Sequence, residues 1–264
     1  MPTKNAQTAC TPMKIALTAS PPRRSPRGRG GAEARIVRSI GEAIADRRLP
    51  PGTKLAEESL AQVFSVSRER VRKVLLLLAQ RQVVTLIPNR GAFVAKPTAQ
   101  EAREVFEARR VIERAVMDKI CALPRPLPPA MLARLNDHRA QEEAAERAGD
   151  RKALIRLSGQ FHLLLAEFAG NGTLATILAS LIDRSGLAIA AFERRTAHTC
   201  SAEDHRRLID ALAGTGDHTH GAGCGCADAV TLMMTHLDAV EAQLDLDATP
   251  DTAVDLKSIF AEDG

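Results

Sequence analysis

The sequence contains no tryptophan and no tyrosine, and phenylalanine occurs only 7 times in 264 residues. Proteins that bind single-stranded nucleic acid stack bases on aromatic side chains, so this scarcity argues against that class of binder. Cysteine is scarce too, and its five positions show no regular spacing: Cys10, Cys121, Cys200, Cys224 and Cys226. An odd number of scattered cysteines argues against a disulfide framework and favours free thiols in a reducing cytoplasm.

Long apolar runs are also missing from the sequence pattern. No stretch approaches the roughly 20 consecutive apolar residues expected of a membrane-spanning helix. The apolar segment 15–19 is too short to be the core of a signal peptide. We therefore expect a cytoplasmic protein without a membrane partner.

Acidic residues are absent from residues 1–31, which carry six lysines and arginines together with several prolines and glycines. This composition predicts a disordered basic arm. Two interpretations of the arm are open: it contacts DNA phosphates, or it is a flexible start without a role. The net charge of the whole chain, +4, is compatible with nucleic-acid binding but does not establish it.

Apolar residues make up 45% of the chain, mostly alanine, leucine, isoleucine and valine in runs with helical periodicity. We therefore predict a mainly α fold, with an N-terminal winged helix-turn-helix over 32–96, an all-α helical bundle over 97–247 and a loose acidic tail over 248–264. Capping-box patterns begin at Thr98 and at Ser201. The expected helices of the bundle are 99–122, 129–148, 151–169, 172–195, 202–213 and 227–245.

The order of elements within residues 55–94 is the most informative structural pattern in the chain. A short helix over 57–64 is followed by a turn at 65–66 and by a second helix that opens at Ser67. Two short apolar runs then flank the polar tip 88–91, which predicts a β-hairpin. Helix, turn, basic helix and hairpin in this order indicate a winged helix-turn-helix, whose second helix enters the major groove of duplex DNA.

Basic side chains cluster in the first turns of the second helix. Arg68 and Arg72 are four residues apart and share a face, where a guanidinium can bond a guanine edge. Arg70 and Lys73 point elsewhere and are expected on phosphates. A single winged helix contacts few bases, so we expect a symmetric homodimer on a palindromic double-stranded operator. The expected DNA-contacting residues are Ser67 as the helix cap, Arg68, Arg70, Arg72, Lys73, Asn89, Arg90 and Gly91.

Three histidines lie in apolar stretches of three different predicted helices, at His162, His205 and His236. A single histidine in such a place is typical of a hydrogen-bonded core residue. A helical bundle can also bring three of them together, and neutral imidazole binds Zn, Ni and similar divalent ions. Spacing alone leaves both interpretations open.

A second cluster of ligand-type side chains lies in segment 217–226, which carries His218, His220, Cys224 and Cys226. Thiolates and imidazoles suit Zn or Cu(I), so a second metal or thiol site is one hypothesis. A flexible glycine-rich insertion whose side chains never converge is the other.

The residues Pro51-Gly52-x-x-Leu55, Leu60-Ala61, Val66-Ser67-Arg68-x-x-Val71-Arg72, Leu75-x-x-Leu78 and Asn89-Arg90-Gly91-x-Phe93-Val94 form a dense pattern over residues 32–96. This pattern resembles the DNA-binding domain of the GntR family of regulators. The resemblance implies that Ser67, Arg68 and Arg72 contact the operator and that Gly91 forms the wing tip.

A second pattern follows, in Glu107-x-Arg109-x-x-x-Glu113, Phe161-His162, Ala169-Gly170-Asn171, His205-x-x-Leu208-Ile209 and His236-Leu237. It resembles the FCD helical domain of the FadR subgroup of that family. In many members of the subgroup, three histidines and an aspartate hold a metal that binds a carboxylate effector, and an arginine helps to hold the carboxylate. The residues implied here are His162, His205 and His236 for the metal, and Arg109, Ser158 and Asn171 for the ligand.

The sequence departs from both patterns. Ser158 stands where the usual aspartate ligand lies, one helical turn before His162. Three arrangements follow: three histidines with water and effector, a replacement carboxylate such as Asp204, or no metal. In the DNA-binding part, segment 80–82 lacks the acidic residue and glycine that are common there, and Glu58 stands where some relatives place a DNA-contacting arginine.

These patterns predict a DNA-binding transcriptional regulator, a repressor by the habit of the family, and not an enzyme. A small organic acid in the C-terminal domain is expected to control operator binding, with a bound divalent metal as one route. Two alternatives are a metal-dependent hydrolase built on the three histidines and an architectural DNA-binding protein that senses no ligand. The hydrolase is disfavoured because no carboxylate is obviously placed as a general base and a DNA-reading segment has no role in it.

Overall fold

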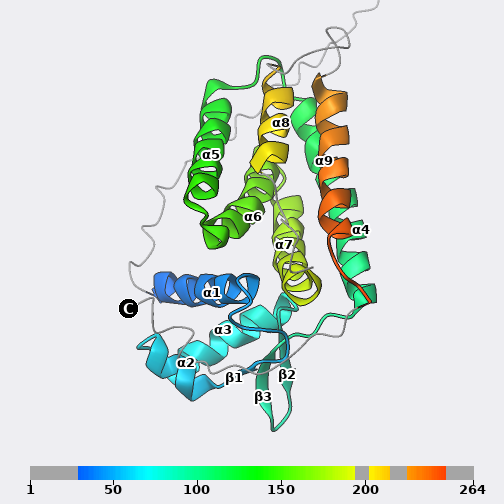
Figure 1. Ribbon diagram of the computed structural model, residues 1–264. Helices are drawn as coiled ribbons and strands as arrows, with labels where there is room; N and C mark the ends of the chain where they lie inside the picture. The colour runs from blue at the N-terminus through cyan, green and yellow to red at the C-terminus, as the bar shows by residue number, and fades with distance from the viewer. Residues whose placement is uncertain (1–28, 194–201, 215–224, 248–264) are drawn as a thin grey trace, which may run out of the picture.

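The structure, a computed structural model, describes residues 29–193, 202–214 and 225–247 (Figure 1). Its first part comprises α1 (Arg29–Ala45), β1 (Lys54–Leu55), α2 (Glu57–Val63), α3 (Arg68–Gln80), β2 (Val84–Ile87) and β3 (Gly91–Val94). Its second part comprises α4 (Ala99–Cys121), α5 (Pro129–Ala148), α6 (Arg151–Phe168), α7 (Gly172–Phe192), α8 (Ala202–Ala213) and α9 (Gly225–Ala242). The predicted fold class, a winged helix-turn-helix followed by an all-α bundle, is confirmed.

The second helix of the motif, α3, begins at the predicted position. Ser67 is its N-cap and accepts a hydrogen bond from the backbone N–H of Arg70 at 3.3 Å, which satisfies one of the free donors of the first turn. Four apolar side chains of α3 recur at helical spacing and are buried, while Arg68, Arg72 and Lys73 are exposed. The buried residues are Val71, Val74, Leu75 and Leu78.

The predicted hairpin is part of a three-stranded antiparallel sheet with the strand order β1-β3-β2. At its turn, Ile87 lies opposite Gly91, and the backbone N–H of Arg90 donates to the carbonyl of Ile87 at 3.0 Å. On the other edge of β3, Lys54 pairs with Phe93. The sequence pattern does not predict β1, because two residues are too few to show the alternation of a strand.

The start of the fold differs from the prediction. The structure begins α1 at Arg29, so this helix extends three residues into the segment 1–31 for which the composition predicts disorder. Once a helix has formed, each added residue gains a backbone hydrogen bond without a new nucleation cost. The rest of the predicted arm, residues 1–28, the tail 248–264 and the expected cap Ser201 lie outside the described residues.

The helices of the bundle lie close to their predicted bounds. Thr98 and the glutamate three residues later form the predicted capping box at the start of α4. α7 ends at Phe192 and α9 at Ala242, each three residues before the predicted end. The reason is a tertiary contact: Glu193 and Leu244, which follow the two helices, pair in an antiparallel bridge and take up extended backbone there.

α7 belongs to the cores of both parts of the molecule. Its Leu187 and Ala190 pack in one cluster with buried side chains of α1, α3 and the sheet. α1 lies across the end of the bundle and contacts α6 and α7 (Figure 1). The winged part therefore rests directly on a helix of the bundle, which the sequence pattern alone does not reveal.

Two ion pairs join the winged part to α7 and its end. Arg47 Nη2 lies 2.7 Å from Glu193 Oε2, whose side chain is buried. Arg81 Nη1 lies 3.0 Å from Asp183 Oδ2. Arg81 is the C-cap of α3, so its pair with Asp183 connects the end of α3 directly to α7.

α7 is also long and apolar enough, by length and composition, to cross a membrane, which corrects the expectation that no stretch of the chain reaches that length. It packs against α1, α4 and α6. About a third of its apolar window, 33%, is buried inside the described structure.

Candidate DNA-binding face and three-histidine centre

The two arginines predicted to read bases lie on the exposed side of α3, each beside a carboxylate of α2. The Arg68 side chain is 63% exposed, and its Nη1 lies 3.7 Å from Glu58 Oε2. Arg72 donates two hydrogen bonds of 2.9 Å to Glu57, and this bonding holds the pKa of the Glu57 carboxyl below its usual value. Exposed ion pairs of this kind are weak, so DNA can replace them.

The two cations expected on phosphates differ in their surroundings. Lys73 is exposed and pairs with Glu33 of α1 at 3.1 Å, whereas Arg70 is half-buried. α2 and the hairpin extend away from the bundle, on either side of α3 (Figure 1). The basic side chains Arg68, Arg72 and Lys73 of α3 are exposed, with 63–70% of each side chain accessible.

The wing tip is a tight turn in left-handed backbone. Asn89 has φ +60° and Gly91 has φ +96°, conformations that asparagine and glycine adopt more readily than other residues. The Arg90 guanidinium lies 5.8 Å from the centre of the Phe93 ring. All three predicted wing residues are exposed at this tip.

The three predicted metal-binding histidines converge in the interior of the bundle. His162 comes from α6, His205 from α8 and His236 from α9. One ring nitrogen of each lies within 4.8 Å of those of the other two. All three side chains are buried, with at most 3% of each residue exposed. The structure thus brings together residues that the sequence separates by 74 positions, counted from 162 to 236.

Each of these histidines faces a carboxylate with its Nδ1 atom. An Nδ1–H that donates to a carboxylate fixes the tautomer and leaves Nε2 with the lone pair that binds a metal. The three pairs are His162–Glu113 at 2.5 Å, His205–Glu142 at 2.7 Å and His236–Asp204 at 3.3 Å.

Burial and neighbouring charges set the protonation of this cluster. Burial opposes ionisation of Glu113, but the Arg109 guanidinium and then His162 lower the pKa of Glu113 to about 2. Burial is the largest influence on His162 and lowers its pKa to about 3, against the opposite effect of Glu113. His162 is therefore neutral at pH 7, which is the form in which imidazole binds a metal.

Arg109, expected to hold the carboxylate of an effector, is buried beside this centre. Its Nε donates to Glu113 at 2.8 Å and its Nη1 to the Ser185 hydroxyl of α7 at 3.2 Å. Its Nη2 is buried and has no hydrogen-bond partner among the described residues. Two of its donor groups are therefore committed to the protein, and a third is open.

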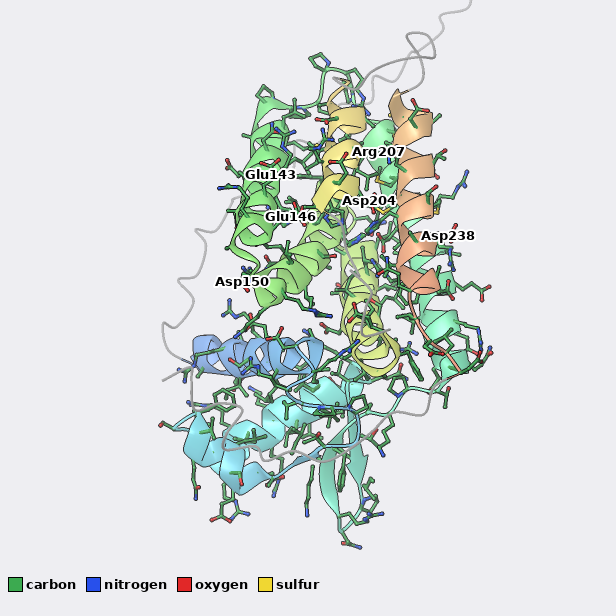
Figure 2. The ribbon with its side chains drawn as sticks, viewed as in Figure 1. Glu143, Glu146, Asp150, Asp204, Arg207 and Asp238 are labelled. Atoms are coloured by element: carbon green, nitrogen blue, oxygen red, sulfur yellow. The ribbon has the colours of Figure 1, made fainter. Side chains whose placement is uncertain are left out.

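The other two residues implied as ligand contacts lie differently. Ser158 is half-buried on α6, one turn before His162, and the ligand set that the described residues bring together consists of histidines. Asn171 caps α7, where its side-chain oxygen accepts from two backbone N–H groups of the first turn. The alternative carboxylate, Asp204 on α8 (Figure 2), bonds the Nδ1 of His236 and thus orients a ligand.

Sequence reasoning named Asp204 as an alternative metal ligand and quoted Glu113 within the FCD pattern, but it paired neither with a particular histidine, and it missed Glu142. The structure places all three carboxylates in direct contact with the histidines. One signal was available: Glu142 follows His138 by four residues on the inward side of α5, and charged residues on an inward face are uncommon unless paired.

The second predicted cluster is divided by the structure. His218, His220 and Cys224 lie outside the described residues. Cys226 lies in the first turn of α9, where its thiol is beside that of Cys121 at the end of α4. Cys121 is a partner that spacing along the chain does not suggest.

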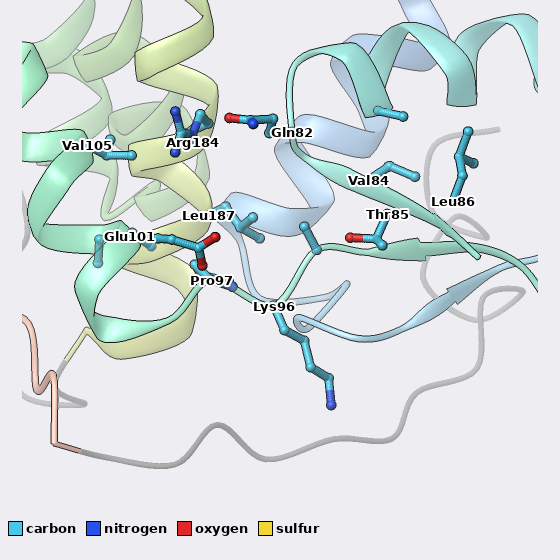
Figure 3. Close-up of a pocket in the computed structure, with 14 residues that line it drawn as sticks. Gln82, Val84, Thr85, Leu86, Lys96, Pro97, Glu101, Val105, Arg184 and Leu187 are labelled. Atoms are coloured by element: carbon cyan, nitrogen blue, oxygen red, sulfur yellow. The ribbon is translucent and has the colours of Figure 1, made fainter. Parts of the chain in front are cut away.

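A separate cavity of about 380 Å³ lies between the base of the wing and helices α4 and α7 (Figure 3). Gln82, Thr85, Lys96, Glu101 and Arg184 supply its polar lining. The three histidines do not line it, so it is distinct from the three-histidine centre.

The buried pair of Arg109 and Glu113 leads to a prediction for stability. Replacement of Glu113 by alanine leaves a buried guanidinium without its counter-ion and should lower the free energy of unfolding by roughly 3–5 kcal/mol. Glu167→Ala, which removes the exposed partner of Arg134, is the matched control and should change it little. Urea unfolding of metal-free protein measures both, and equal losses for the two variants would contradict the assignment.

A basic, capped helix exposed beside a wing, joined to a bundle with a buried set of ligand-type side chains, defines a DNA-binding regulator with a sensory domain. The family model described as "Bacterial regulatory proteins, gntR family" matches residues 32–94, and the FCD domain model matches residues 104–219. The chain belongs to the GntR family of bacterial transcriptional regulators and carries an FCD domain.

Relatives and solved structures agree with this assignment. An HTH-type transcriptional regulator from an unstable DNA locus of Streptomyces ambofaciens is 28% identical over 208 residues, 78% of this chain and 81% of the relative. The repressor RspR of Escherichia coli K12 is 27% identical over 134 residues, 51% of this chain and 58% of its own length. A GntR regulator from Rhodococcus sp. RHA1 has the same fold, with a TM-score of 0.65 at 23% identity over 81% of this chain and 97% of that one. The protein is a transcriptional regulator and not an enzyme.

Proposed function

We propose that this protein is a repressor whose DNA binding is controlled by a small organic acid, through a divalent metal held in the bundle. The observation that carries the proposal is the convergence of three buried histidines, each backed by a carboxylate, in the domain that follows a DNA-binding one. The sign of control is suggested by RspR, which is named a repressor. We place the protein in the cytoplasm, where its operator is.

The residues fit a divalent ion such as Zn or Ni. His162, His205 and His236 would hold it through their Nε2 atoms, and three protein ligands leave a position for an exogenous one. When bound, the ion would supply a positive charge that attracts a carboxylate. Ser158 is a weaker ligand than the aspartate common at its position, so we assign the metal to the histidines alone.

The effector is proposed to be a carboxylate because the buried Arg109 guanidinium, beside the three-histidine centre, has one N–H group without a hydrogen-bond partner among the described residues. A buried N–H group without a partner is uncommon in a protein. Arg109 Nη2 is such a group, and the other donors of the same guanidinium fix its position on Glu113 and Ser185. A carboxylate that reached it would gain a charge-assisted hydrogen bond.

On the DNA side, we propose that the carboxylates of α2 occupy the base-reading arginines while no operator is bound. On binding, Arg68 would leave Glu58, and Arg72 would leave Glu57, to bond base edges. The DNA backbone and minor groove would be contacted by Ser67, Arg70, Lys73, Asn89, Arg90 and Gly91. In a homodimer, each of the two winged parts would bind one half-site of a palindromic operator. Exposed apolar side chains on the bundle, including Val111 and Ile177, are available for the dimer contact.

We propose that α7 connects the two sites. Ser185 of α7 bonds Arg109, which reaches His162 through Glu113. Two residues earlier on α7, Asp183 pairs with the C-cap of α3. A ligand that changes the position of Arg109 therefore acts on the same helix that supports the DNA-binding part.

Replacement of Asp183 by asparagine tests this connection. We expect operator affinity without ligand to change at most a few-fold, and the loss of affinity on adding the effector to become smaller. Asp238→Asn, which weakens an exposed pair with Arg110 within the bundle, is the control and should respond as wild type. Fluorescence anisotropy with labelled operator measures both, and an unchanged response of the Asp183 variant would exclude this route.

The whole proposal is tested in two steps. Elemental analysis of the purified protein measures whether a divalent metal is bound, and a thermal-shift screen of carboxylic acids, with and without a chelator, finds the effector. We expect stabilisation by at least one acid that disappears after chelation. If the same acid stabilised the metal-free protein equally well, it would bind without the metal, and the role proposed for the three histidines would be wrong.

A further inference from the structure

Two cysteines from distant parts of the chain lie side by side at one end of the bundle. Cys121 is the last residue of α4 and Cys226 is the second residue of α9. The sulfur of Cys121 lies 3.7 Å from the carbonyl oxygen of Cys226, and the sulfur of Cys226 lies 3.9 Å from the carbonyl oxygen of Cys121. This reciprocal arrangement places the two thiols within hydrogen-bonding reach of each other.

A guanidinium lies directly on one of the two sulfurs. Arg125 Nη2 is 2.7 Å from Cys226 Sγ. The Nη1 atom of the same side chain donates to the carbonyl of Leu212 at the end of α8, which holds the guanidinium in place. A fixed cation beside a sulfur is the surrounding in which protein thiols react as thiolates. Burial, followed by the contact with Cys226, raises the pKa of the Cys121 thiol to about 12, so Cys121 keeps its proton.

Small reagents can reach the pair from solvent. Both cysteines are half-buried and line a groove of about 510 Å³ between α4 and α9. Arg114 and Asp118 of α4 line the same groove. The site therefore contains two adjacent thiols, one of which is in contact with a guanidinium, and a small oxidant can reach both. Redox-sensing cysteine pairs have these features.

We propose that Cys121 and Cys226 form a reversible disulfide on exposure to a peroxide, with Cys226, whose sulfur the Arg125 guanidinium contacts, as the attacking residue. The Cys226 sulfur attacks one peroxide oxygen and the O–O bond breaks. The proton lost from the Cys226 thiol goes to the departing hydroxide, so hydrogen peroxide yields a sulfenic acid at Cys226 and one water. The Cys121 sulfur then attacks the sulfenic sulfur, the S–S bond forms, the S–O bond breaks, and the thiol proton leaves with the hydroxyl as a second water. The two thiols are oxidised by two electrons and the peroxide is reduced by two.

The cross-link would join helices that also carry parts of the three-histidine centre. α4 contributes Glu113 and α9 contributes His236. The bond would close a loop between residues 105 positions apart. Closing a long loop restricts the unfolded chain, so the oxidised protein should melt at a higher temperature than the reduced one. This inference does not depend on the identity of the effector or of the operator.

The first test uses the unmodified full-length protein. It is treated with a small molar excess of hydrogen peroxide, its remaining thiols are alkylated, and its peptides are mapped by mass spectrometry without reduction. The expected result is a peptide pair linked through Cys121 and Cys226, lighter by two hydrogens and released by dithiothreitol, at a peroxide dose that leaves Cys10 reduced. A bond between Cys224 and Cys226 instead, or sulfinic acid without any cross-link, would overturn the proposal.

The second test isolates the cation. Arg125→Met should slow formation of the cross-link several-fold, and Arg125→Lys should restore part of the rate. Arg114→Met is the matched control, because Arg114 lines the same groove while the cation that contacts the Cys226 sulfur is Arg125, and it should react as wild type. Melting of each reduced variant reports whether it is folded. Equal rates of cross-link formation in Arg125→Met and wild type would show that Arg125 does not activate Cys226. The first test, on the unmodified protein, does not depend on any variant.

Discussion

Replacement of His205 by alanine is expected to reduce the metal content of the purified protein from about one ion per chain to near zero, because the proposed site uses three histidines and this variant keeps two. His205 is fully buried, its Nδ1 is fixed by Glu142 at 2.7 Å, and its ring stacks on Phe161. No other side chain of the described residues is placed to replace it in the set of three. Elemental analysis after gel filtration measures the effect.

The matched control for this experiment is His138→Ala. His138 is also a buried histidine beside Glu142, but it is outside the set of converging nitrogens. The control variant should keep most of its metal. Since either substitution leaves a small cavity, circular dichroism should first show that both are folded. If the His205 variant kept the metal-to-protein ratio of wild type, His205 would not be a ligand, and the metal would bind elsewhere in the chain.

Replacement of Arg68 by alanine should weaken binding to the operator by roughly 5- to 150-fold while weakening binding to random DNA much less. The range corresponds to the roughly 1–3 kcal/mol by which a bidentate arginine discriminates between bases. Arg68 is the first residue of α3, directly after the cap, and its side chain is 63% exposed beside Glu58, whose carboxylate oxygen lies 3.7 Å away. Gel-shift titrations with operator and with random DNA at one salt concentration measure the two losses.

Lys73→Ala is the control for a phosphate contact. It should weaken both kinds of DNA about equally and reduce the dependence of affinity on salt by roughly one ion. Its exposed pair with Glu33 shows that the ammonium is accessible. If Arg68→Ala also lowers both affinities equally, Arg68 contacts phosphate and the base-reading residues must be sought elsewhere on the winged part.

The DNA-binding part could be predicted largely from local sequence. The cap at Ser67, the buried stripe that begins at Val71 and the glycine at the wing tip are each recorded in a few neighbouring residues, because helix periodicity and turn conformation are local properties. The strand β1 was beyond this reasoning, since Lys54 and Leu55 form a strand only by pairing with β3.

The candidate metal centre was predictable in part. The three histidines could be selected because each lies in an apolar helical stretch, and the family resemblance named the same three. The carboxylates that orient them could not be paired with them in advance, because Glu142 and His205 lie 63 residues apart and meet only when α5 packs on α8. The resemblance also implied ligand contact at Asn171, where the structure shows a helix cap.

By itself, the sequence determined that this chain is a helical protein with an N-terminal DNA-binding part, because apolar periodicity, capping residues and the basic start of one helix are local patterns of neighbouring residues. Only the tertiary structure decided what those helices share. It placed Leu187 in the core of the winged part, aligned Asp183 with the end of α3, and brought Cys121 against Cys226. The physical reason is that packing joins residues according to which helix faces become buried together, and that choice depends on the whole bundle rather than on any one segment.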